Sequence, residues 1–191
     1  MSKPQKRRPT NPRRRFNGRL DSTDLAILDA LQSSGRMSNV ELARRVGISA
    51  PGCLERVRKL ELRGVIRGYV ALLDPRAVDK ATTAFVTVAL RAHGADILER
   101  VTRAVVALDE VRACWHIAGD IDLLLKVVVS DLAAYETFVR RKLSAIDGIG
   151  RIKTSFALAA PKDETRIPLD AAGMDATIHA IASQREARRM K

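Results

Sequence analysis

The sequence predicts an α+β protein in which a winged-type helix-turn-helix domain precedes a ferredoxin-like βαββαβ domain. Apolar residues recur at helical spacing in three short segments between residues 20 and 64. A glycine-containing turn separates the second segment from the third, which is the helix-turn-helix pattern. From residue 81 to residue 161, β-branched runs alternate with amphipathic segments in the order βαββαβ. That order is typical of the split βαβ sandwich.

The first helix is expected between residues 22 and 35. Ser22 or Thr23 can serve as its N-cap, because a hydroxyl oxygen accepts a hydrogen bond from a backbone N–H of the first turn. Gly35 provides the stop signal. The apolar face predicted to be buried consists of Leu25, Leu28 and Leu31.

The second helix is expected to start after Ser38, and Glu41 three residues later completes a capping box. Gly47 ends it. The third helix has Ser49 as its N-cap and Pro51 in its first turn, where a missing N–H costs nothing. It ends at Gly64. The predicted buried faces are Val40, Ala43 and Val46 in the second helix and Leu54, Val57 and Leu60 in the third.

The remaining elements are predicted from β-branched runs and from helical periodicity. Residues 65–75 read as a strand that leads into a linker. The sandwich then has strands at 83–90, 111–118, 121–129 and 150–160, and helices within 95–109 and 130–146. Two helices cover only one face of such a sheet, so the other face is open and invites a partner sheet.

These patterns divide the chain into five parts. They are a basic arm (1–19), the helix-turn-helix domain (20–64), a strand and linker (65–80), the ferredoxin-like domain (81–161), and a C-terminal extension (162–191) with a short helix expected near 174–188. The arm contains eight Lys or Arg and no acidic residue, in a chain whose net charge is +12. Two interpretations of the arm stay open: contact with nucleic acid or another anionic surface, and a solvated, disordered tail.

Several functional classes lack their signatures. No segment approaches the roughly 18 apolar residues of a membrane span, and the basic start has no apolar core of a secretory signal. Cys53 and Cys114 show no metal-ligand spacing and are expected to be reduced thiols of a cytoplasmic protein. His93, His116 and His179 are scattered. Without a phosphate loop, a nucleophile elbow or a zinc signature, neither an enzyme nor a cofactor is expected.

The third predicted helix is the candidate DNA reader, because such a helix places its first turns near the base edges of the major groove. Arg56 has the length and the donors for two hydrogen bonds to guanine, and the other basic residues suit phosphate contacts. An ordinary charged helix face is the alternative. The candidate DNA-binding residues are Arg36, Ser38, Arg44, Arg45, Ser49, Ala50, Pro51, Gly52, Arg56, Arg58, Lys59 and Arg63.

Asp120 and Asp122 stand two apart at the start of an apolar strand. They could form an acid–base pair, since residues two apart on a strand share a face. Gly119 and Asp120, however, are expected in the turn, where an aspartate commonly caps nearby N–H groups. Asp122 is expected on the strand itself, where its carboxylate could receive the ammonium of a small ligand while backbone N–H groups bind the ligand carboxylate.

Three motifs carry a resemblance to the Lrp/AsnC (feast/famine) transcriptional regulators, and closest to their leucine-responsive members. They read GRMSNVELARRVG at 35–47, CLERVRKLE at 53–61 and AGDIDLLLKV at 118–127, and the resemblance extends from about residue 20 to residue 161. It implies that the first half binds double-stranded DNA and that the second half is an amino-acid-sensing RAM domain. The family helix-turn-helix falls on 39–58.

The resemblance further implies homodimers built through the β-rich halves, often assembled into octamers, with a small amino acid bound between dimers. The chain differs from the family at Leu123, where an aromatic residue is common, and Trp115 and His116 are bulkier than expected, which leaves the effector unidentified. The effector-binding residues implied are Trp115, His116, Gly119, Asp120, Asp122, Leu123 and Thr154.

The favoured interpretation is therefore a cytoplasmic, nucleoid-associated transcriptional regulator whose assembly or DNA binding responds to a small amino acid. One alternative is an architectural DNA-binding protein without an effector. Another is an enzyme similar to the siroheme decarboxylases, which resemble this family in both halves. Such an enzyme needs ionisable residues lining a tetrapyrrole-sized pocket, and the three histidines are the only candidates.

Overall fold

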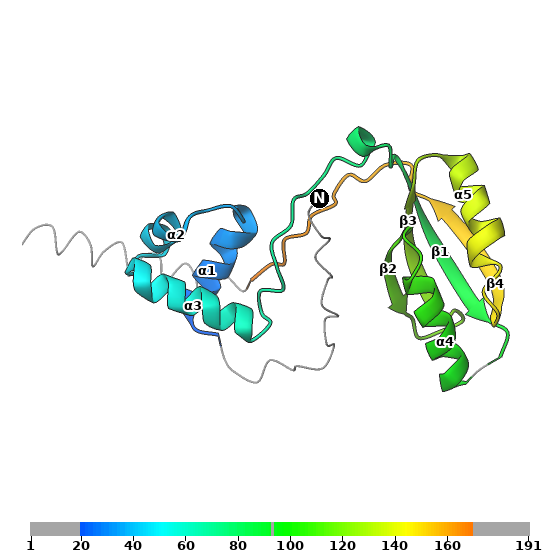
Figure 1. Cartoon of the computed structure of the whole chain (residues 1–191), viewed down its shortest axis with the longest axis horizontal. Helices are drawn as coiled ribbons and strands as arrows, with labels where there is room; N and C mark the ends of the chain where they lie inside the picture. Colours follow the sequence, from blue (N-terminus) through cyan, green and yellow to red (C-terminus); the bar gives the residue numbers. More distant parts are fainter. Residues whose placement is uncertain (1–19, 93, 170–191) are drawn as a thin grey trace, which may run out of the picture. The chain divides into compact units, whose positions relative to one another are not determined.

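A computed structural model describes residues 20–92 and 94–169 of the chain, and it forms two compact units. The N-terminal unit contains residues 20–71 and 164–169, and the sheet unit contains residues 72–163. The chain therefore passes between the units twice (Figure 1). The basic arm, His93, His179 and the helix expected near 174–188 lie outside the described residues.

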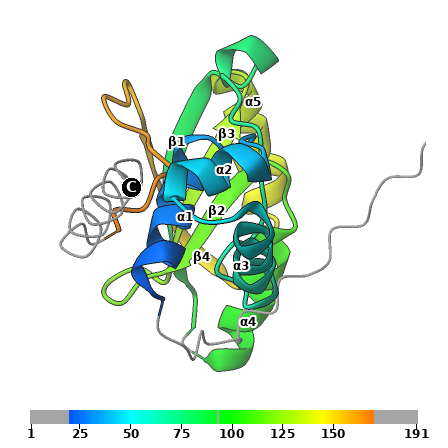
Figure 2. The same cartoon turned by 90° about the vertical axis from the view of Figure 1, so that its left-hand side faces the viewer.

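Three helices form the N-terminal unit (Figure 2). They are α1 (Ser22–Ser33), α2 (Asn39–Val46) and α3 (Ala50–Leu62). Their shared core is aliphatic, as the scarcity of aromatic residues requires. Its buried members are Ile27, Ala30, Leu42, Ala43, Val46, Cys53 and Leu60.

The caps of α2 and α3 form as predicted. Ser38 Oγ accepts the N–H of Glu41, and the Glu41 carboxylate accepts the N–H of Ser38. Gly47 ends α2 in the left-handed conformation, at a φ of 77° that a residue with a side chain rarely adopts. Ser49 caps α3, and Pro51 lies in its first turn.

The expected start of α1 is wrong by one or two residues. Its N-cap is Asp21, whose carboxylate accepts the N–H of Asp24 at 2.8 Å, rather than Ser22 or Thr23. The Asp24 carboxylate in turn accepts the N–H of Asp21, which completes a capping box. Both hydroxyl residues were plausible, but a carboxylate at the helix start also complements the positive end of the helix dipole.

The buried stripes of the three helices are shifted from the predicted ones. Val40 is 69% exposed and Leu54 is 39% exposed. The predicted stripe of α1 is only half buried, and it consists of Leu25, Leu28 and Leu31. The positions that reach the centre are instead Ile27, Ala30, Leu42 and Cys53. Short helices have several apolar sides, and the packing angle between them decides which side is buried.

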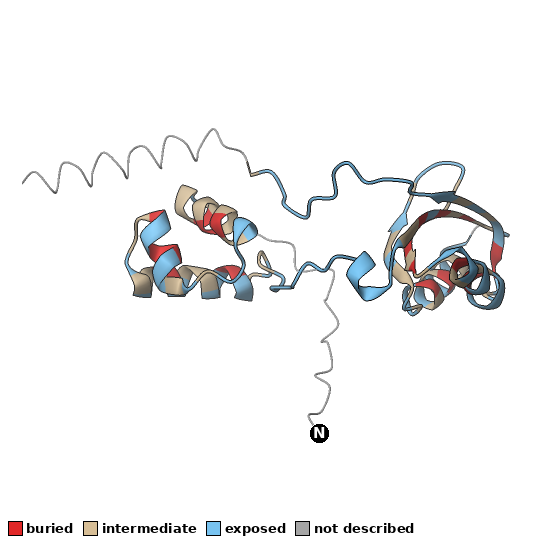
Figure 3. Cartoon of the chain, turned by 90° about the horizontal axis from the view of Figure 1, so that it is seen from above, coloured by how far each residue is buried: buried red, intermediate tan, exposed pale blue. Residues whose placement is uncertain are grey.

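The predicted strand at 65–75 does not form within the described residues. The segment leaves α3 through Gly64 and runs without a ladder partner, and Val70 and Leu72 are 80% and 73% exposed. Figure 3 shows that residues 67–81 and 157–168 are exposed throughout. β-branched residues favour a strand only when another strand pairs with it.

The sheet unit has the predicted βαββαβ order. Its elements are β1 (Thr82–Leu90), α4 (Ala95–Val106), β2 (Val111–His116), β3 (Leu123–Val129), α5 (Leu132–Phe138) with a π-helical turn at Val139–Leu143, and β4 (Ile149–Phe156). The sheet is antiparallel in the order β2-β3-β1-β4. Strands β2 and β4 end earlier than predicted, and β3 begins two residues later.

Side chains alternate between the two faces of this sheet. Val86 of β1 and Leu125 of β3 are paired and fully buried against α4 and α5. The opposite, open face includes Phe85 and Trp115, which are 39% and 45% exposed. No helix among the described residues is long and apolar enough to cross a membrane.

Candidate nucleic-acid interface and ligand-binding site

A side-chain hydrogen bond fixes the turn between α2 and α3. Asn39 Nδ2, in the first turn of α2, donates to the carbonyl oxygen of Ala50 at 2.8 Å. It holds the start of α3 against the start of α2. Gly52 belongs to the same feature, because a Cβ there would lie 3.0 Å from Ser49 Oγ and press on the cap. The sequence did not predict this role of Asn39, because no local pattern indicates a hydrogen-bond partner eleven residues away.

Arg56 links α3 to the start of α1. Its Nη1 donates to Asp21 Oδ2 at 2.7 Å and to Asp24 Oδ1 at 2.8 Å. Burial alone would raise the pKa of Asp21, but hydrogen bonds from Arg56 and from the Asp24 N–H outweigh it and lower that pKa. The Arg56 guanidinium thus compensates the negative charge of the Asp24 carboxylate, which is buried. Both bonds use Nη1 of Arg56, so this residue has a structural role besides the base-reading role predicted from the sequence.

The other cations of α3 face outward. Lys59 pairs with Glu55 at 2.6 Å, and both side chains are more than 60% exposed. The hydrogen bond from Lys59 lowers the pKa of Glu55. Arg58 is exposed beside them, while Arg63 at the end of the helix is half buried. The surface of α3 therefore offers Arg58 and Lys59 to a polyanion, with Glu55 as a competing carboxylate.

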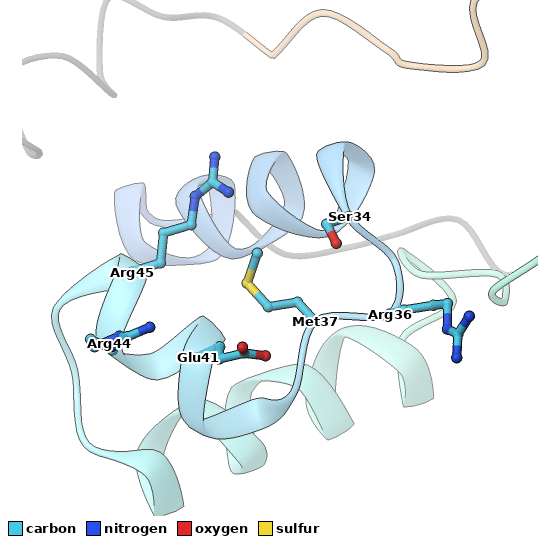
Figure 4. A pocket seen from close by; sticks show the side chains of 6 residues that line it. All are labelled: Ser34, Arg36, Met37, Glu41, Arg44 and Arg45. Atoms are coloured by element: carbon cyan, nitrogen blue, oxygen red, sulfur yellow. The ribbon is translucent and has the colours of Figure 1, made fainter.

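Three exposed arginines surround a shallow pocket on the N-terminal unit. Arg36, Arg44 and Arg45 line it together with Ser34, Met37 and Glu41, and its volume is about 480 Å³. Figure 4 shows Met37 and Glu41 between Arg44 and Arg36. Hydrogen bonds from the Ser38 hydroxyl and N–H lower the pKa of Glu41, so its carboxylate is committed to the α2 cap. Three cations around one engaged carboxylate suit a phosphate backbone.

The loop between β2 and β3 is shaped by Asp122. Its N–H donates to the carbonyl of Val88, its carbonyl accepts the N–H of Ile117, and its Oδ2 accepts the N–H of Leu90 at 2.7 Å. Gly119 has a φ of 135° in the same loop. Asp120 is exposed. The structural hydrogen bond that was expected of Asp120 is therefore made by Asp122.

The other predicted effector residues do not converge at one place in the chain. Trp115 pairs with Leu124 on the open face, whereas His116 pairs with Leu123 on the face that carries the helices. Leu123 is 1% exposed and lies in the core of the sheet unit. Thr154 Oγ1 lies 2.5 Å from Tyr135 Oη of α5, which places it on the helix-covered face and away from Trp115.

His116 instead lines a second shallow pocket. Its other lining residues come from α4, and the volume is about 430 Å³. They are Ala95, Leu98, Glu99, Thr102 and Arg103.

Cys53 and Cys114 are free thiols, and burial raises the pKa of each. Within the described ranges 20–92 and 94–169, no three His, Cys, Asp or Glu residues are grouped as metal ligands would be.

Comparison with known proteins identifies the domain type of each unit. A family model described as a winged helix-turn-helix DNA-binding domain matches residues 20–67, and the Lrp/AsnC ligand binding domain matches residues 83–167. The leucine-responsive regulatory proteins of Escherichia coli K12 and Klebsiella pneumoniae are each 40% identical over 148 residues, which is 78% of this chain and 90% of theirs.

Solved structures show the same likeness. A Neisseria meningitidis transcriptional regulator in complex with L-methionine aligns with a TM-score of 0.76 and 37% identity, over 81% of this chain and 99% of that one. An AsnC family regulator from Agrobacterium tumefaciens aligns with a TM-score of 0.75 and 38% identity, over 79% and 98%.

Proposed function

We propose that this chain, which belongs to the Lrp/AsnC family of transcriptional regulators, binds specific DNA sites through its N-terminal unit and changes that binding when a small amino acid occupies the sheet unit. The observation that carries the proposal is the capped α2–α3 helix-turn-helix beside three exposed arginines. Family membership indicates transcriptional regulation rather than catalysis. We therefore also propose that the protein acts on chromosomal DNA in the cytoplasm.

The DNA-contacting surface combines α3 with the pocket arginines. The first turn of α3, residues 49–52, enters the major groove, because the residues there are small or exposed and Asn39 holds the turn in place. Arg58 and Lys59 lie farther along the helix, and Arg36, Arg44 and Arg45 contact the phosphates. Arg56 has no direct contact with a base in this proposal.

A salt series tests the phosphate contacts. Each neutralised phosphate contributes about 0.9 to the slope of log affinity against log salt concentration. Arg44→Ala/Arg45→Ala is therefore expected to lower the slope by about two for each DNA-bound chain, across specific and unspecific sequences alike. The matched control is Arg91→Ala/Arg112→Ala, which removes two exposed arginines from the sheet unit. Equal slopes for both variants and the unmodified protein would refute the assignment.

The effector site is proposed at the open face of the sheet, next to the β2–β3 loop. Asp120 receives the ligand ammonium, the backbone N–H groups of the loop bind its carboxylate, and Trp115 contacts its side chain. Asp122 holds the loop in place through Leu90. The proposed effector site no longer includes three of the residues expected from the sequence, because they lie on the helix-covered face of the sheet. They are His116, Leu123 and Thr154. A site at an open face is completed by a second subunit.

The same face supports self-association. Phe85 and Trp115 leave large aromatic surfaces exposed on neighbouring parts of the sheet, which isolated soluble domains avoid over wide patches. We infer dimers formed through the sheet units and larger assemblies, up to an octamer, with the ligand between subunits.

A panel of the twenty amino acids tests the sensing role. A ligand that binds only the folded state raises its apparent stability, so one small amino acid should raise the melting temperature and alter assembly or DNA affinity. Leucine and methionine come first, because the relatives are named for leucine and the Neisseria regulator was solved with L-methionine. A panel without any effect on stability, assembly or DNA binding would favour an architectural DNA-binding protein.

A further inference from the structure

The segment that follows the sheet unit returns to α1 and binds it through side chains. Gln32 Nε2 donates to the carbonyl oxygen of Ile167 at 3.0 Å, and the N–H of Ile167 donates to Gln32 Oε1 at 2.7 Å. The Arg166 guanidinium pairs with Asp29. These contacts join residues more than 130 positions apart in the sequence. The segment was expected only as part of an undefined C-terminal extension.

The binding surface on α1 is specific for an extended segment. The Gln32 amide satisfies both the N–H and the carbonyl of one residue, as a neighbouring strand would do, and an amide is the only uncharged side-chain group that can donate and accept in this way. Asp29 lies one turn earlier on the same face of α1. Its side chain is only 20% exposed, with Arg166 as the cation that it faces.

The chain is also attached just before this segment. Asp163, the last residue of the sheet unit, lies 3.4 Å from Lys126 Nζ of β3. Only Glu164 and Thr165 separate this residue from Arg166. The second passage between the units is therefore short and anchored at both ends, whereas the first passage, residues 67–81, is longer.

We propose that residues 163–167 form a strap, by which the chain's own C-terminal segment docks on Asp29 and Gln32 of α1 and couples the DNA-binding unit to the ligand-binding unit. The coupling rests on the proposed function, while the docking does not. With the strap docked, the DNA-binding unit is held by two connections, and a change in the sheet unit reaches α1 directly. With the strap released, only the longer passage at 67–81 remains.

Trypsin tests the docking on the full-length protein. The enzyme cleaves after arginine, and in the docked strap the Arg166 side chain is paired with Asp29 while Gln32 holds the N–H and the carbonyl of Ile167, which opposes entry of this peptide bond into a protease. In Asp29→Asn/Gln32→Ala, cleavage between Arg166 and Ile167 should accelerate roughly fivefold or more, because cleavage follows the population of the open form. Cleavage between Arg67 and Gly68 in the other passage serves as the internal reference and should keep its rate.

The matched control is Ser33→Ala, a change on α1 beside Gln32 that leaves the strap contacts intact. Equal cleavage after Arg166 in the double variant and the unmodified protein would overturn the docking. Protection that disappears on dilution would also overturn it, because a strap from the same chain is independent of concentration and one from a second copy is not.

The coupling has a separate readout. Asp29 and Gln32 lie outside the proposed DNA surface, so the double variant should keep basal operator affinity within about twofold while the amino-acid-induced change in affinity shrinks severalfold. An unchanged response in a variant whose strap is released would overturn the coupling. If no amino acid alters DNA binding in the unmodified protein, the proposed sensing role fails, and the trypsin result still decides the docking.

Discussion

Arg56 shows how a residue that the sequence predicts to contact DNA can have a structural role in the fold. A basic residue in the second turn of a recognition helix is a reasonable base reader. In the structure its guanidinium joins two carboxylates at the N-terminus of α1, one of them buried. An unpaired buried carboxylate is costly, so this contact stabilises the relative positions of α1 and α3.

We predict that Arg56→Met lowers the free energy of unfolding of the N-terminal unit by about 1–2 kcal/mol at pH 7, a charge-assisted hydrogen bond discounted for its partial exposure. The folded-state pKa of Asp21 lies below its ordinary value of 3.8. Its ion pair therefore contributes fully above pH 3.8 and loses its contribution as the pH falls through the lower, folded-state pKa.

Urea unfolding at pH 7 and at pH 3 checks this prediction, and the gap between Arg56→Met and the unmodified protein should narrow at the lower pH. Arg58→Met is the control, since Arg58 is exposed on the same helix. Equal stabilities of the two variants at pH 7 would show that Arg56 has no structural role.

We predict that substitutions at the two aspartates of the β2–β3 loop have different effects, on stability at Asp122 and on ligand binding at Asp120. Asp122→Ala leaves the N–H of Leu90 without its acceptor and should cost about 1–2 kcal/mol of stability. Asp122→Asn keeps an oxygen acceptor and should recover most of it. Asp120→Asn should change stability by less than about 0.5 kcal/mol and weaken amino-acid binding.

Thermal unfolding and calorimetric titration with the amino acid found in the panel measure the two effects. If the Asp120→Asn protein binds the amino acid with undiminished affinity, another group binds the ligand ammonium. An unaltered melting temperature in Asp122→Ala would mean that Leu90 finds a different acceptor.

At the scale of elements, local signals and packing decide different things. Ser38, Glu41 and Ser49 cap their helices as predicted, because capping depends on residues three positions apart. The buried stripe of α1 was predicted wrongly. Ile27 and Ala30 are buried because α2 and α3 lie on their side of the helix, and no local pattern contains that information.

Asn39 carries the prediction that belongs to this scale. Asn39→Ala removes the hydrogen bond to Ala50 and should cost about 0.5–1.5 kcal/mol. It also frees the turn between α2 and α3, so operator affinity should fall further than stability alone requires. The control is Val40→Ala, at a 69% exposed position next to Asn39 in the first turn of α2. Operator affinity is measured at a temperature where both variants are folded. An Asn39→Ala protein with unaffected operator affinity would contradict the prediction.

At the scale of the whole molecule, charge is distributed unevenly. Residues 1–19 carry eight cations and no acid, whereas residues 170–191 carry four cations and three acids. Deletion of 1–19 should lower the salt slope of DNA binding by up to about seven for each chain, at about 0.9 for each phosphate neutralised. Deletion of 170–191 is the control and should change it far less. A slope that survives the first deletion would mean that the arm does not touch DNA.

The sequence alone determined what depends on neighbours along the chain. The caps of α2 and α3, the βαββαβ order and the alternation of Leu123 and Leu125 with Leu124 all follow from periodicity and short-range hydrogen bonds. The missing strand at 65–75 marks the limit of this information, because strand formation requires a partner from elsewhere.

Only the tertiary structure decided which polar side chains find partners. The bonds of Arg56 with Asp21 and Asp24, of Asp122 with Leu90, and of Gln32 with Ile167 span 32 to 135 positions. Each links groups that become neighbours only after the helices and strands pack. Because Asp122 is engaged with Leu90 in this way while Asp120 is exposed, Asp120 is the residue that we propose as the ligand contact.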